Sequence, residues 1–403
     1  RMRQSSTSRL AVDGAPLDLG RDVSVLGLTD ADIDGPVAWL GDAASVDTAG
    51  SSLEGKVAAV LLDGSAAPPA EDALAARRWI RRAPQLAARA ALARGAAAVL
   101  VVADARADAL FELGTTNAQR GRYAIDDGGR ARGPDRSERP VLLVRNARAA
   151  RIRSATRFTA RFTIDVFDYP SVNVVARVPG TDPSLRDEYV LFSAHQDHDG
   201  VRAAIAGDSI WNGADDNASV AVAVLAIGRA WAQQPGRRSA LFVWHGAEEK
   251  GLFGSRWYSA HPTVPRESIV AVLNGDMIGR NAPDTAALLG SIPPHRNSAD
   301  LVDMAIRAND RVTGFAIDST WDRPEHPEGW YFRSDHLPYA RLPIPALFFS
   351  SNLHADYHTP RDGPERIDTD KVTRIARWMY ATGWLVANTT ERPRVEPDFK
   401  LER

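Results

Sequence analysis

The stretch Tyr189-Val190-Leu191-Phe192-Ser193-Ala194-His195 decides the fold of the larger part of the chain. A nearly unbroken apolar run of this length is typical of a strand buried on both faces. The run stops at His195 and Asp197, whose side chains can hold a cation. Two further apolar runs, Leu241 to Trp244 and Ile269 to Leu273, also stop at acidic residues. This recurrence is the main indication of function.

Strand-like and helix-like patterns alternate from residue 172 onward. Residues 172–178 and 188–194 have strand patterns, and residues 219–232 have the composition of a helix. This alternation predicts an α/β fold with a mostly parallel sheet and helices on both faces. Ligands of such sheets bind beyond the carboxyl ends of the strands. We therefore expect the polar residues that follow the three runs to meet at one edge.

The first part of the chain has a different texture. We expect a lead-in strand or tail over residues 1–20, a smaller β-plus-α domain over 21–166, the catalytic domain over 167–392 and a charged tail over 393–403. In the smaller domain the patterns predict strands at 57–62, 95–102 and 140–144, a helix at 84–94 and an exposed loop at 126–139. No cluster of candidate ligands occurs there, which favours a packing or lid module.

Composition excludes several classes of protein. The 49 basic and 51 acidic residues give a net charge of −2, which does not favour nucleic acid or a membrane surface as partner. No window approaches eighteen uninterrupted apolar residues, so no transmembrane helix is expected. The absence of cysteine excludes disulfides, thiolate zinc sites and a cysteine nucleophile. A metal site must then be built from His, Asp and Glu. The start of the chain has no signal-peptide pattern and is expected to be the edge of a longer precursor.

The polar residues after the runs fit a metal centre. His195 and Asp197 are two residues apart, so on an extended segment both side chains point to one side and Asp197 can orient the His195 ring. Asp215-Asp216-Asn217 follows a glycine and opens a helix, where a carboxylate could bridge two cations. Asp276 is a candidate terminal ligand, and His358 offers a second imidazole.

Glu248 and Glu249 are the most informative pair. Adjacent residues in a turn point in different directions, so one can bind a metal while the other faces the water. A base beside a metal-activated water is what hydrolysis requires. Of the remaining histidines, we expect His261, His295 and His326 at the surface or in loops, and His198, His245 and His354 to pack or hydrogen-bond near the site without binding metal.

Five separated pieces resemble the co-catalytic zinc peptidases of the leucyl aminopeptidase, glutamate carboxypeptidase and transferrin receptor superfamily. They are His195-Gln196-Asp197, Gly213 to Ser219, Ala247 to Leu252, Asn274 to Met277 and Tyr357-His358-Thr359, within residues 170–390. Each piece alone is weak, but all five in this order are specific. The smaller domain resembles the protease-associated domain of bacterial-type members, through Gly55-Lys56-Val57 and the stretch 95–99.

Carried over position by position, the resemblance implies two zinc ions per chain bridged by Asp216. One zinc would also take His195 and Asp276, and the other Glu249 and His358. Glu248 would be the general base and then the acid, and Asp197 would orient His195. Tyr331, three residues before Ser334-Asp335-His336, would help to hold the oxyanion, with Tyr339 and Tyr357 as rivals and aromatic packing as the alternative role.

Two departures from the family pattern stand beside this resemblance. Val220 replaces the usual glycine after Asn-Ala-Ser, and the helical lead-in before the smaller domain is missing.

The resemblance implies a zinc-dependent exopeptidase, with an aminopeptidase as the first hypothesis. A carboxypeptidase or dipeptidase with the same dizinc site stays open, because Arg280, Arg323, Arg333 and Arg361 lie near site pieces in the sequence. A non-catalytic receptor-like protein and a single-zinc acyltransferase are further alternatives. The implied partners are a peptide substrate and a second copy in a homodimer, and the implied location is periplasmic or secreted. The preferred substrate side chain is not implied.

Overall fold

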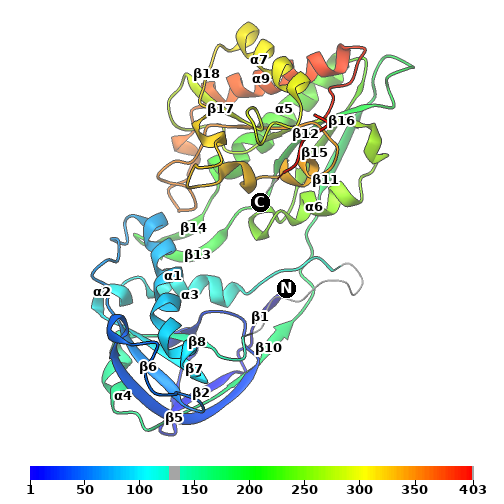
Figure 1. The fold of residues 1–403 in the computed structure, drawn as a ribbon. Coiled ribbons are helices and arrows are strands. Elements are labelled where there is room, and N and C mark those ends of the chain that lie inside the picture. The colour runs from blue at the N-terminus through cyan, green and yellow to red at the C-terminus, as the bar shows by residue number, and fades with distance from the viewer. Residues whose placement is uncertain (127–136, 402–403) are drawn as a thin grey trace. The chain divides into compact units, whose positions relative to one another are not determined.

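The computed structural model describes residues 1–126 and 137–401. Within these ranges the chain forms two compact units, one of residues 1–169 with 202–209 and the other of residues 170–201 with 210–403 (Figure 1). Residues 1–20, expected to precede the first unit, contribute strands to it. The centre of the expected loop over 126–139 lies outside the described residues. No described helix is long and apolar enough to cross a membrane.

The first unit is built on an eight-stranded sheet in the order β3-β2-β9-β5-β6-β7-β8-β4. Its strands are β2 (Arg9–Val12), β3 (Ala15–Leu17), β4 (Val23–Val25), β5 (Ala31–Asp42), β6 (Val57–Leu62), β7 (Ala98–Ala103), β8 (Val141–Val144) and β9 (Arg157–Phe162). β1 (Met2–Gln4) pairs separately with β10 (Ile164–Val166). The strands predicted at 57–62, 95–102 and 140–144 are confirmed as the parallel neighbours β6, β7 and β8.

The helices of this unit are α1 (Ala73–Ala93), α2 (Ala105–Asp108), α3 (Phe111–Arg120) and α4 (Ala149–Arg153). α1 begins eleven residues before the predicted helix at 84–94. The side chain of Asp72 caps its first turn by accepting a hydrogen bond from the amide of Ala75. Pro84, which suggested a helix start, is instead buried inside the helix.

The second unit is built on a seven-stranded sheet in the order β11-β15-β12-β16-β19-β17-β18. Its strands are β11 (Val174–Val178), β12 (Tyr189–His195), β15 (Ser239–His245), β16 (Ile269–Gly275), β17 (Thr285–Leu289), β18 (Ala316–Ile317) and β19 (Ala346–Ser350). The central strands β15, β12, β16 and β19 are mutually parallel, while β11 and β17 are antiparallel to their neighbours β15 and β19. The predicted α/β fold with a mostly parallel sheet is confirmed.

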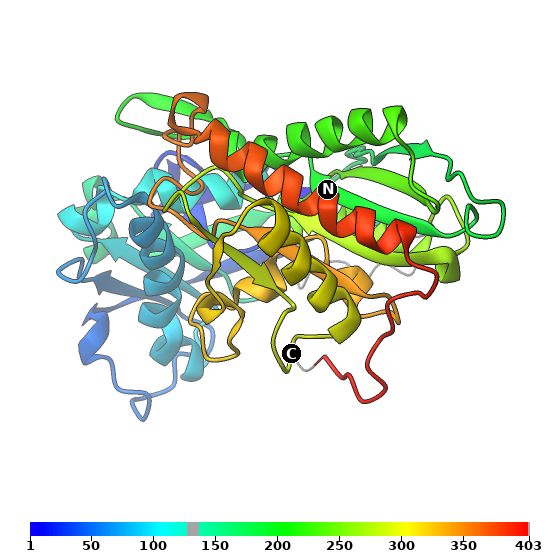
Figure 2. The same cartoon turned by 90° about the horizontal axis from the view of Figure 1, so that it is seen from above.

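Helices cover both faces of this sheet. They are α5 (Val220–Gln233), α6 (Phe253–Ala260), α7 (Ala299–Val312), α8 (Leu337–Ala340) and α9 (Thr369–Asn388). Side chains alternate along β12: Val190 and Phe192 pack with α5, α7 and α9, whereas Tyr189 and Leu191 pack with Tyr258 of α6. Figure 2 shows α9 running beside α7 and α5 on one face.

The chain end belongs to the second unit. Arg394 pairs with Asp300 at 2.9 Å, and Glu396 pairs with Arg296 at 2.8 Å. The described part of the expected charged tail is therefore held against α7 and the loop before it. Between β12 and α5 the chain forms the hairpin β13 (Gly200–Ile205) and β14 (Asp208–Trp211).

Candidate metal centre

The four central parallel strands deliver the candidate ligands to one edge of the sheet. His195 is the last residue of β12 and is paired in register with His245, the last residue of β15. Asp276 follows directly after β16, and His358 lies in the loop after β19. Because parallel strands end on the same side, residues distant in sequence converge there. The fold therefore brings the candidate ligands together at one edge of the sheet, as the sequence predicts.

Asp216 lies between two imidazoles. Its Oδ1 is 3.2 Å from Nε2 of His195, and its Oδ2 is 3.0 Å from Nε2 of His358. The side chain is buried. Burial alone would raise the pKa of Asp216, but the neighbouring imidazoles of His195 and His358 lower it strongly. A carboxylate that presents one oxygen to each imidazole has the geometry of a bridging ligand.

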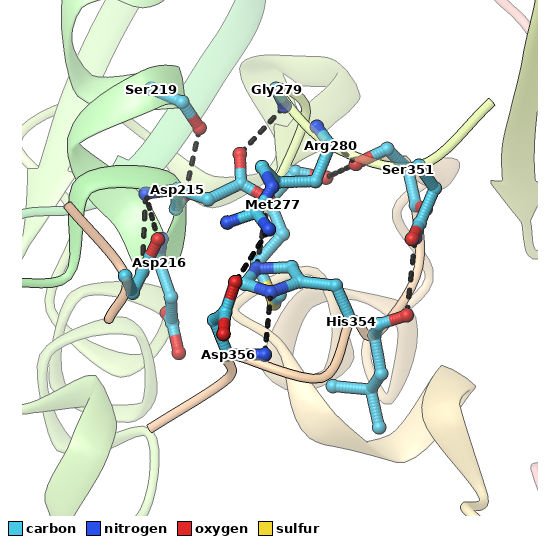
Figure 3. A network of polar contacts seen from close by, with 12 residues as sticks. Asp215, Asp216, Ser219, Met277, Gly279, Arg280, Ser351, His354 and Asp356 are labelled. Atoms are coloured by element: carbon cyan, nitrogen blue, oxygen red, sulfur yellow. Dashed lines mark hydrogen bonds and ion pairs between the residues drawn. The ribbon is translucent and has the colours of Figure 1, made fainter. Parts of the chain in front are cut away.

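The backbone around Asp216 is held by buried acids. The carboxylate of Asp362 accepts hydrogen bonds from the amides of Asp215 and Asp216 at 3.0 and 3.1 Å. Figure 3 shows the carboxylate of Asp215 pointing to the amide of Gly279, which donates to it at 2.6 Å. The Ser219 hydroxyl donates a hydrogen bond to the carbonyl of Asp215 at 2.7 Å. These contacts fix the turn that presents Asp216.

Glu248 and Glu249 have different surroundings although they are adjacent. Oε1 of Glu249 is 3.1 Å from Nε2 of His358, whereas Oε2 of Glu248 is 4.0 Å from Nε2 of His195. Burial raises the pKa of Glu248 well above its usual value. The charge of Glu249 also raises this pKa, while the charge of His195 lowers it. Burial would also raise the pKa of Glu249, but the charges of His358 and His198 bring this pKa well below its usual value. The pKa values of these two neighbouring carboxylates are therefore shifted in opposite directions.

Asp197 supports the site differently from the expectation. The ring Nδ1 of His195 contacts the backbone carbonyl of Asp197 at 3.0 Å, not its carboxylate. The carboxylate instead accepts hydrogen bonds from the amides of Glu248 and Glu249 at 2.9 and 3.3 Å. The Asp197 carbonyl faces the ring, and its carboxylate points toward the amides of the glutamates. Asp197 therefore fixes both the His195 ring and the glutamate turn.

Asp276 is oriented by a fully buried relay of side chains. Ser334 donates to Oδ2 of Asp276 at 2.7 Å and accepts from the amide of Asn274 at 2.8 Å. The amide oxygen of Asn274 accepts from Ser193 at 2.8 Å. Because the Asn274 amide group can only donate to Ser334, the serine proton is directed at Asp276. The other oxygen, Oδ1, has no hydrogen-bond partner.

His358 has its own carboxylate neighbour. Nδ1 of His358 is 3.4 Å from Oδ2 of Asp199, and the other oxygen of Asp199 is 3.8 Å from Nζ of Lys250. A metal-binding histidine usually needs such a partner on its second nitrogen. Sequence reasoning did not single out Asp199. Its position two residues beyond Asp197 on the same segment was the available signal.

His198 also lies in the cluster, near the site as expected. Its Nδ1 is 2.8 Å from Oε1 of Glu249 and 3.9 Å from Oδ2 of Asp216. Two groups could hold a metal ion among the described residues: His198, Asp216, Glu249 and His358 in one, and His195, Glu248 and Asp276 in the other. His198 follows His195 by three residues, and this spacing was the only sequence signal.

Tyr331 lies in an aromatic stack. Its ring lies parallel to that of His295 at 4.2 Å and edge-on to that of His336 at 4.8 Å. The Tyr331 hydroxyl has no hydrogen-bond partner, and burial followed by the charge of Asp322 raises its pKa. These contacts favour aromatic packing for Tyr331, the alternative to holding the oxyanion. His295, expected at the surface or in a loop, lies in the loop between β17 and α7, where it is buried and contacts Asp322.

Tyr357 is the tyrosine whose hydroxyl is tied to the cluster. Burial and then the charge of Asp216 raise its pKa well above the usual value, with Arg333 opposing. Arg333 donates to the Tyr357 hydroxyl at 2.9 Å and also pairs with Glu328 at 2.9 Å. The hydroxyl therefore stays protonated and keeps its own hydrogen available for donation.

The donor set fits a metal such as zinc. Several converging atoms are buried without a hydrogen-bond partner: Nε2 of His195, Nδ1 of His198, Oε1 of Glu249 and Oδ1 of Asp276. Leaving so many buried polar atoms unpaired is costly unless a cation satisfies them. Imidazole and carboxylate are the ligands that zinc takes when thiolate is absent.

Comparison with known sequences identifies the family. Residues 173–383, just over half of the chain, match the family described as Peptidase family M28. The chain belongs to peptidase family M28. The resemblance to co-catalytic zinc exopeptidases is thereby confirmed. Membership of this metallopeptidase family and the donor set together support zinc binding.

Curated relatives of this M28 chain are only partly covered by it. Leucine aminopeptidase 1 of Penicillium rubens is 30% identical over 243 residues, which are 56% of this chain and 59% of that enzyme. Leupeptin-inactivating enzyme 1 of Streptomyces exfoliatus is 33% identical over 112 residues, which are 28% of this chain and 23% of that enzyme. The chain thus spans less than two thirds of either relative.

Two solved structures share the fold of the M28 chain. An aminopeptidase from Aneurinibacillus sp. strain AM-1 aligns with a TM-score of 0.55 at 20% identity, over 98% of this chain and 85% of that one. BSAP, a zinc aminopeptidase from Bacillus subtilis, aligns with a TM-score of 0.55 at 15% identity, over 99% of this chain and 88% of that one. At these identities the likeness establishes the fold.

Proposed function

We propose that this chain is a dizinc aminopeptidase whose two metal ions share Asp216. The observation that carries the proposal is the placement of its two oxygens, 3.2 Å from His195 and 3.0 Å from His358. Asp276 lies on the His195 side, with Oδ2 3.6 Å from Nε2. Glu249 lies on the His358 side at 3.1 Å. Two ligand sets joined by one carboxylate support two ions.

We assign Glu248 as the proton carrier. Zinc bound here would polarise the scissile carbonyl and lower the pKa of an attacking water. Glu248 has a raised pKa and lies beside the His195 side of the cluster, whereas Asp276, whose pKa is also raised, is held by Ser334 as a candidate ligand. It accepts the proton of the water and then gives it to the leaving amine. Asp197 holds the Glu248 amide at 2.9 Å and so keeps the side chain at this position.

We assign Tyr357, in preference to Tyr331, as the donor to the developing oxyanion. The electrostatic influence of Asp216 on Tyr357 and the adjacency of Tyr357 to His358 support this choice. Arg333 occupies a lone pair of the hydroxyl, which leaves its hydrogen free to point at the substrate. A preorganised donor of this kind is a usual source of transition-state stabilisation.

Three of the four arginines near the site in sequence are paired with acids, which supports an aminopeptidase over a carboxypeptidase. A carboxypeptidase needs an unpaired cation for the free carboxylate of its substrate. Arg280 and Arg361 both pair with Asp356, at 2.7 and 2.8 Å, and Arg333 pairs with Glu328. The Penicillium relative is named a leucine aminopeptidase.

The test is a substrate panel with metal quantified on the same sample. We expect hydrolysis of aminoacyl-nitroanilides and free dipeptides, no hydrolysis of their N-acetylated forms, and about two zinc ions per chain. Cleavage of N-blocked substrates alone would replace the proposal with a carboxypeptidase. One zinc per chain with acyl transfer would favour the single-zinc alternative. No metal and no hydrolysis after zinc addition would favour a receptor-like protein.

Three features remain predictions from the family resemblance. They are a periplasmic or secreted location, the assignment of residues 21–166 as a protease-associated domain, and the domain limits that go with it. The predicted homodimer has no support from the structure.

A further inference from the structure

We infer that His198 is a fourth protein ligand on the His358 side of the metal site, beside Asp216, Glu249 and His358. The inference rests on the proposed dizinc function and adds one residue to its ligand set. The first of the five pieces that mark the family site ends at Asp197, one residue short of this histidine. His198 lies three residues beyond the end of β12 and is followed by the hairpin β13–β14.

The distances within this group match a tetrahedral site. Zinc bonds of about 2.0–2.1 Å in tetrahedral geometry place neighbouring donor atoms about 3.3–3.4 Å apart. From Nδ1 of His198 the separations are 2.8 Å to Glu249 and 3.9 Å to Asp216. From Nε2 of His358 they are 3.1 Å to Glu249 and 3.0 Å to Asp216. These four distances lie on both sides of the tetrahedral value, and all four donor atoms lie within 4.8 Å of one another, so one ion could contact His198 as well as His358.

Hydrogen bonding does not account for the position of His198. The side chain is only 8% exposed, yet neither ring nitrogen has a hydrogen-bond partner. The 2.8 Å approach to Glu249 therefore lacks the direction of a hydrogen bond. Oε1 of Glu249 is itself without such a partner. Two buried polar atoms that face each other unpaired are explained by a cation bound to both.

The backbone is shaped to admit the imidazole ring. Gly213 has a φ of 71°, and a Cβ added there would lie 2.3 Å from Cγ of His198. Glycine fits at this position because it tolerates a positive φ and has no Cβ to collide with the His198 ring. On the cluster side, the ring meets that of His358 edge-on at 5.1 Å. The ring is thus confined between Gly213 and His358, with Nδ1 held at the cluster.

The consequence is an unequal pair of metal positions. With His198 the His358 side has four protein ligands, which is the complement of a closed zinc site. The other side has His195, Asp276 and the shared Asp216, which leaves a coordination position for water or substrate. Glu248 lies on that same side, 4.0 Å from His195. With His198 as a ligand, only the ion nearest Glu248 would keep a coordination position at which water or substrate can exchange.

The test compares His198→Ala with His261→Ala, a control at an exposed histidine stacked on Trp257. Zinc content after dialysis and competition with a chromogenic chelator give the affinity of each ion. We expect His198→Ala to keep one tightly bound zinc and to weaken the second at least ~100-fold, beyond the ~10–100-fold range of an outer contact. Retention of the first zinc reports a folded protein. Two zinc ions held as tightly as in the parent would overturn the inference.

A second variant separates ligation from hydrogen bonding. In His198→Asn the amide can place an N–H near the position of Nδ1 and so supply a hydrogen bond to Glu249 without an imidazole ligand. We expect cobalt-substituted His198→Asn to show weakened visible bands and the same loss of affinity as His198→Ala. Parent-like affinity and an unchanged cobalt spectrum would make His198 a positioning residue and overturn the inference. A parent protein that binds no metal would instead remove the proposed function itself.

Discussion

The two sides of the metal cluster are built from the same kinds of residue but are arranged for different tasks. On one side His195 and Asp276 lie beside Glu248, a carboxylate whose pKa is raised. On the other side His358 and Glu249 lie together, and the pKa of Glu249 is lowered. The difference comes from position alone, because Glu248 and Glu249 are neighbours in one turn.

This contrast shows how one turn can supply both a ligand and a base. Asp197 holds the amides of both glutamates, so their backbone is shared and only the side-chain directions differ. Glu249 meets imidazole nitrogen at short distance and stays ionised. Glu248 meets other acids and is more readily protonated. The account can therefore be tested by asking which change affects one side, the other or both.

Asp216→Asn should have the largest effect, because Asp216 alone faces both sides. An amide cannot supply two anionic oxygens, so we expect both zinc ions to be lost and activity to fall by ~10⁴ or more, the upper end of what a single catalytic group supplies. Metal analysis and nitroanilide hydrolysis measure this. Asp310→Asn, an exposed change on α7, is the control. Retention of one tightly bound zinc would show that the sides are not joined.

The glutamate pair gives the sharpest separation. Glu248→Gln should keep both zinc ions yet lose ~10²–10⁴ in kcat, because it removes only the proton carrier. Glu249→Gln, its neighbour, should instead lose the zinc of the His358 side. Kinetics and metal content of the two variants are compared directly. Equal metal loss in both would mean that Glu248 is a ligand as well.

The tyrosines provide a matched pair of smaller effect. Tyr357→Phe should lower kcat by ~10²–10³ without metal loss, the range for one oxyanion donor. Tyr331→Phe removes a hydroxyl that has no hydrogen-bond partner and should change kcat less than ~3-fold. The reverse ranking in steady-state kinetics would return the oxyanion role to Tyr331.

Ser334→Ala should produce a smaller change than Tyr357→Phe, confined to the His195 side. It removes the hydrogen bond to Asp276 and leaves the ligand itself in place. We expect zinc affinity at that side to fall ~10–100-fold and activity to return in excess zinc. Chelator competition measures the loss. An equal loss on the His358 side would show that the relay acts on the whole cluster.

Much of the second unit was predictable because its strands are buried on both faces. Unbroken apolar runs marked β12, β15 and β16, and the polar residues at their ends followed from the direction of a parallel sheet. The neighbourhood of His195, Asp216, Glu249, Asp276 and His358 was expected for that reason. The position of β6 to β8 in the first unit was predicted on the same basis.

Other features depend on the local path of the backbone, which periodicity does not give. Asp197 contacts the His195 ring through its carbonyl and not through its carboxylate. Gly213 leaves space for the His198 ring beside Glu249. Tyr357 lies in the loop after β19 and Tyr331 in the short helix Trp330–Arg333, so their surroundings differ. The start of α1 was missed because Pro84, a common first residue of helices, lies within this one.

The most direct measurement is anomalous diffraction at the zinc edge from crystals of the zinc-loaded protein. The account predicts two peaks separated by the carboxylate of Asp216, one beside His195 and Asp276, the other beside Glu249 and His358. Glu248 should bind neither ion. A single peak, or two peaks with Glu248 as a direct ligand and Glu249 free, would contradict the division of the cluster into a closed side and a catalytic side.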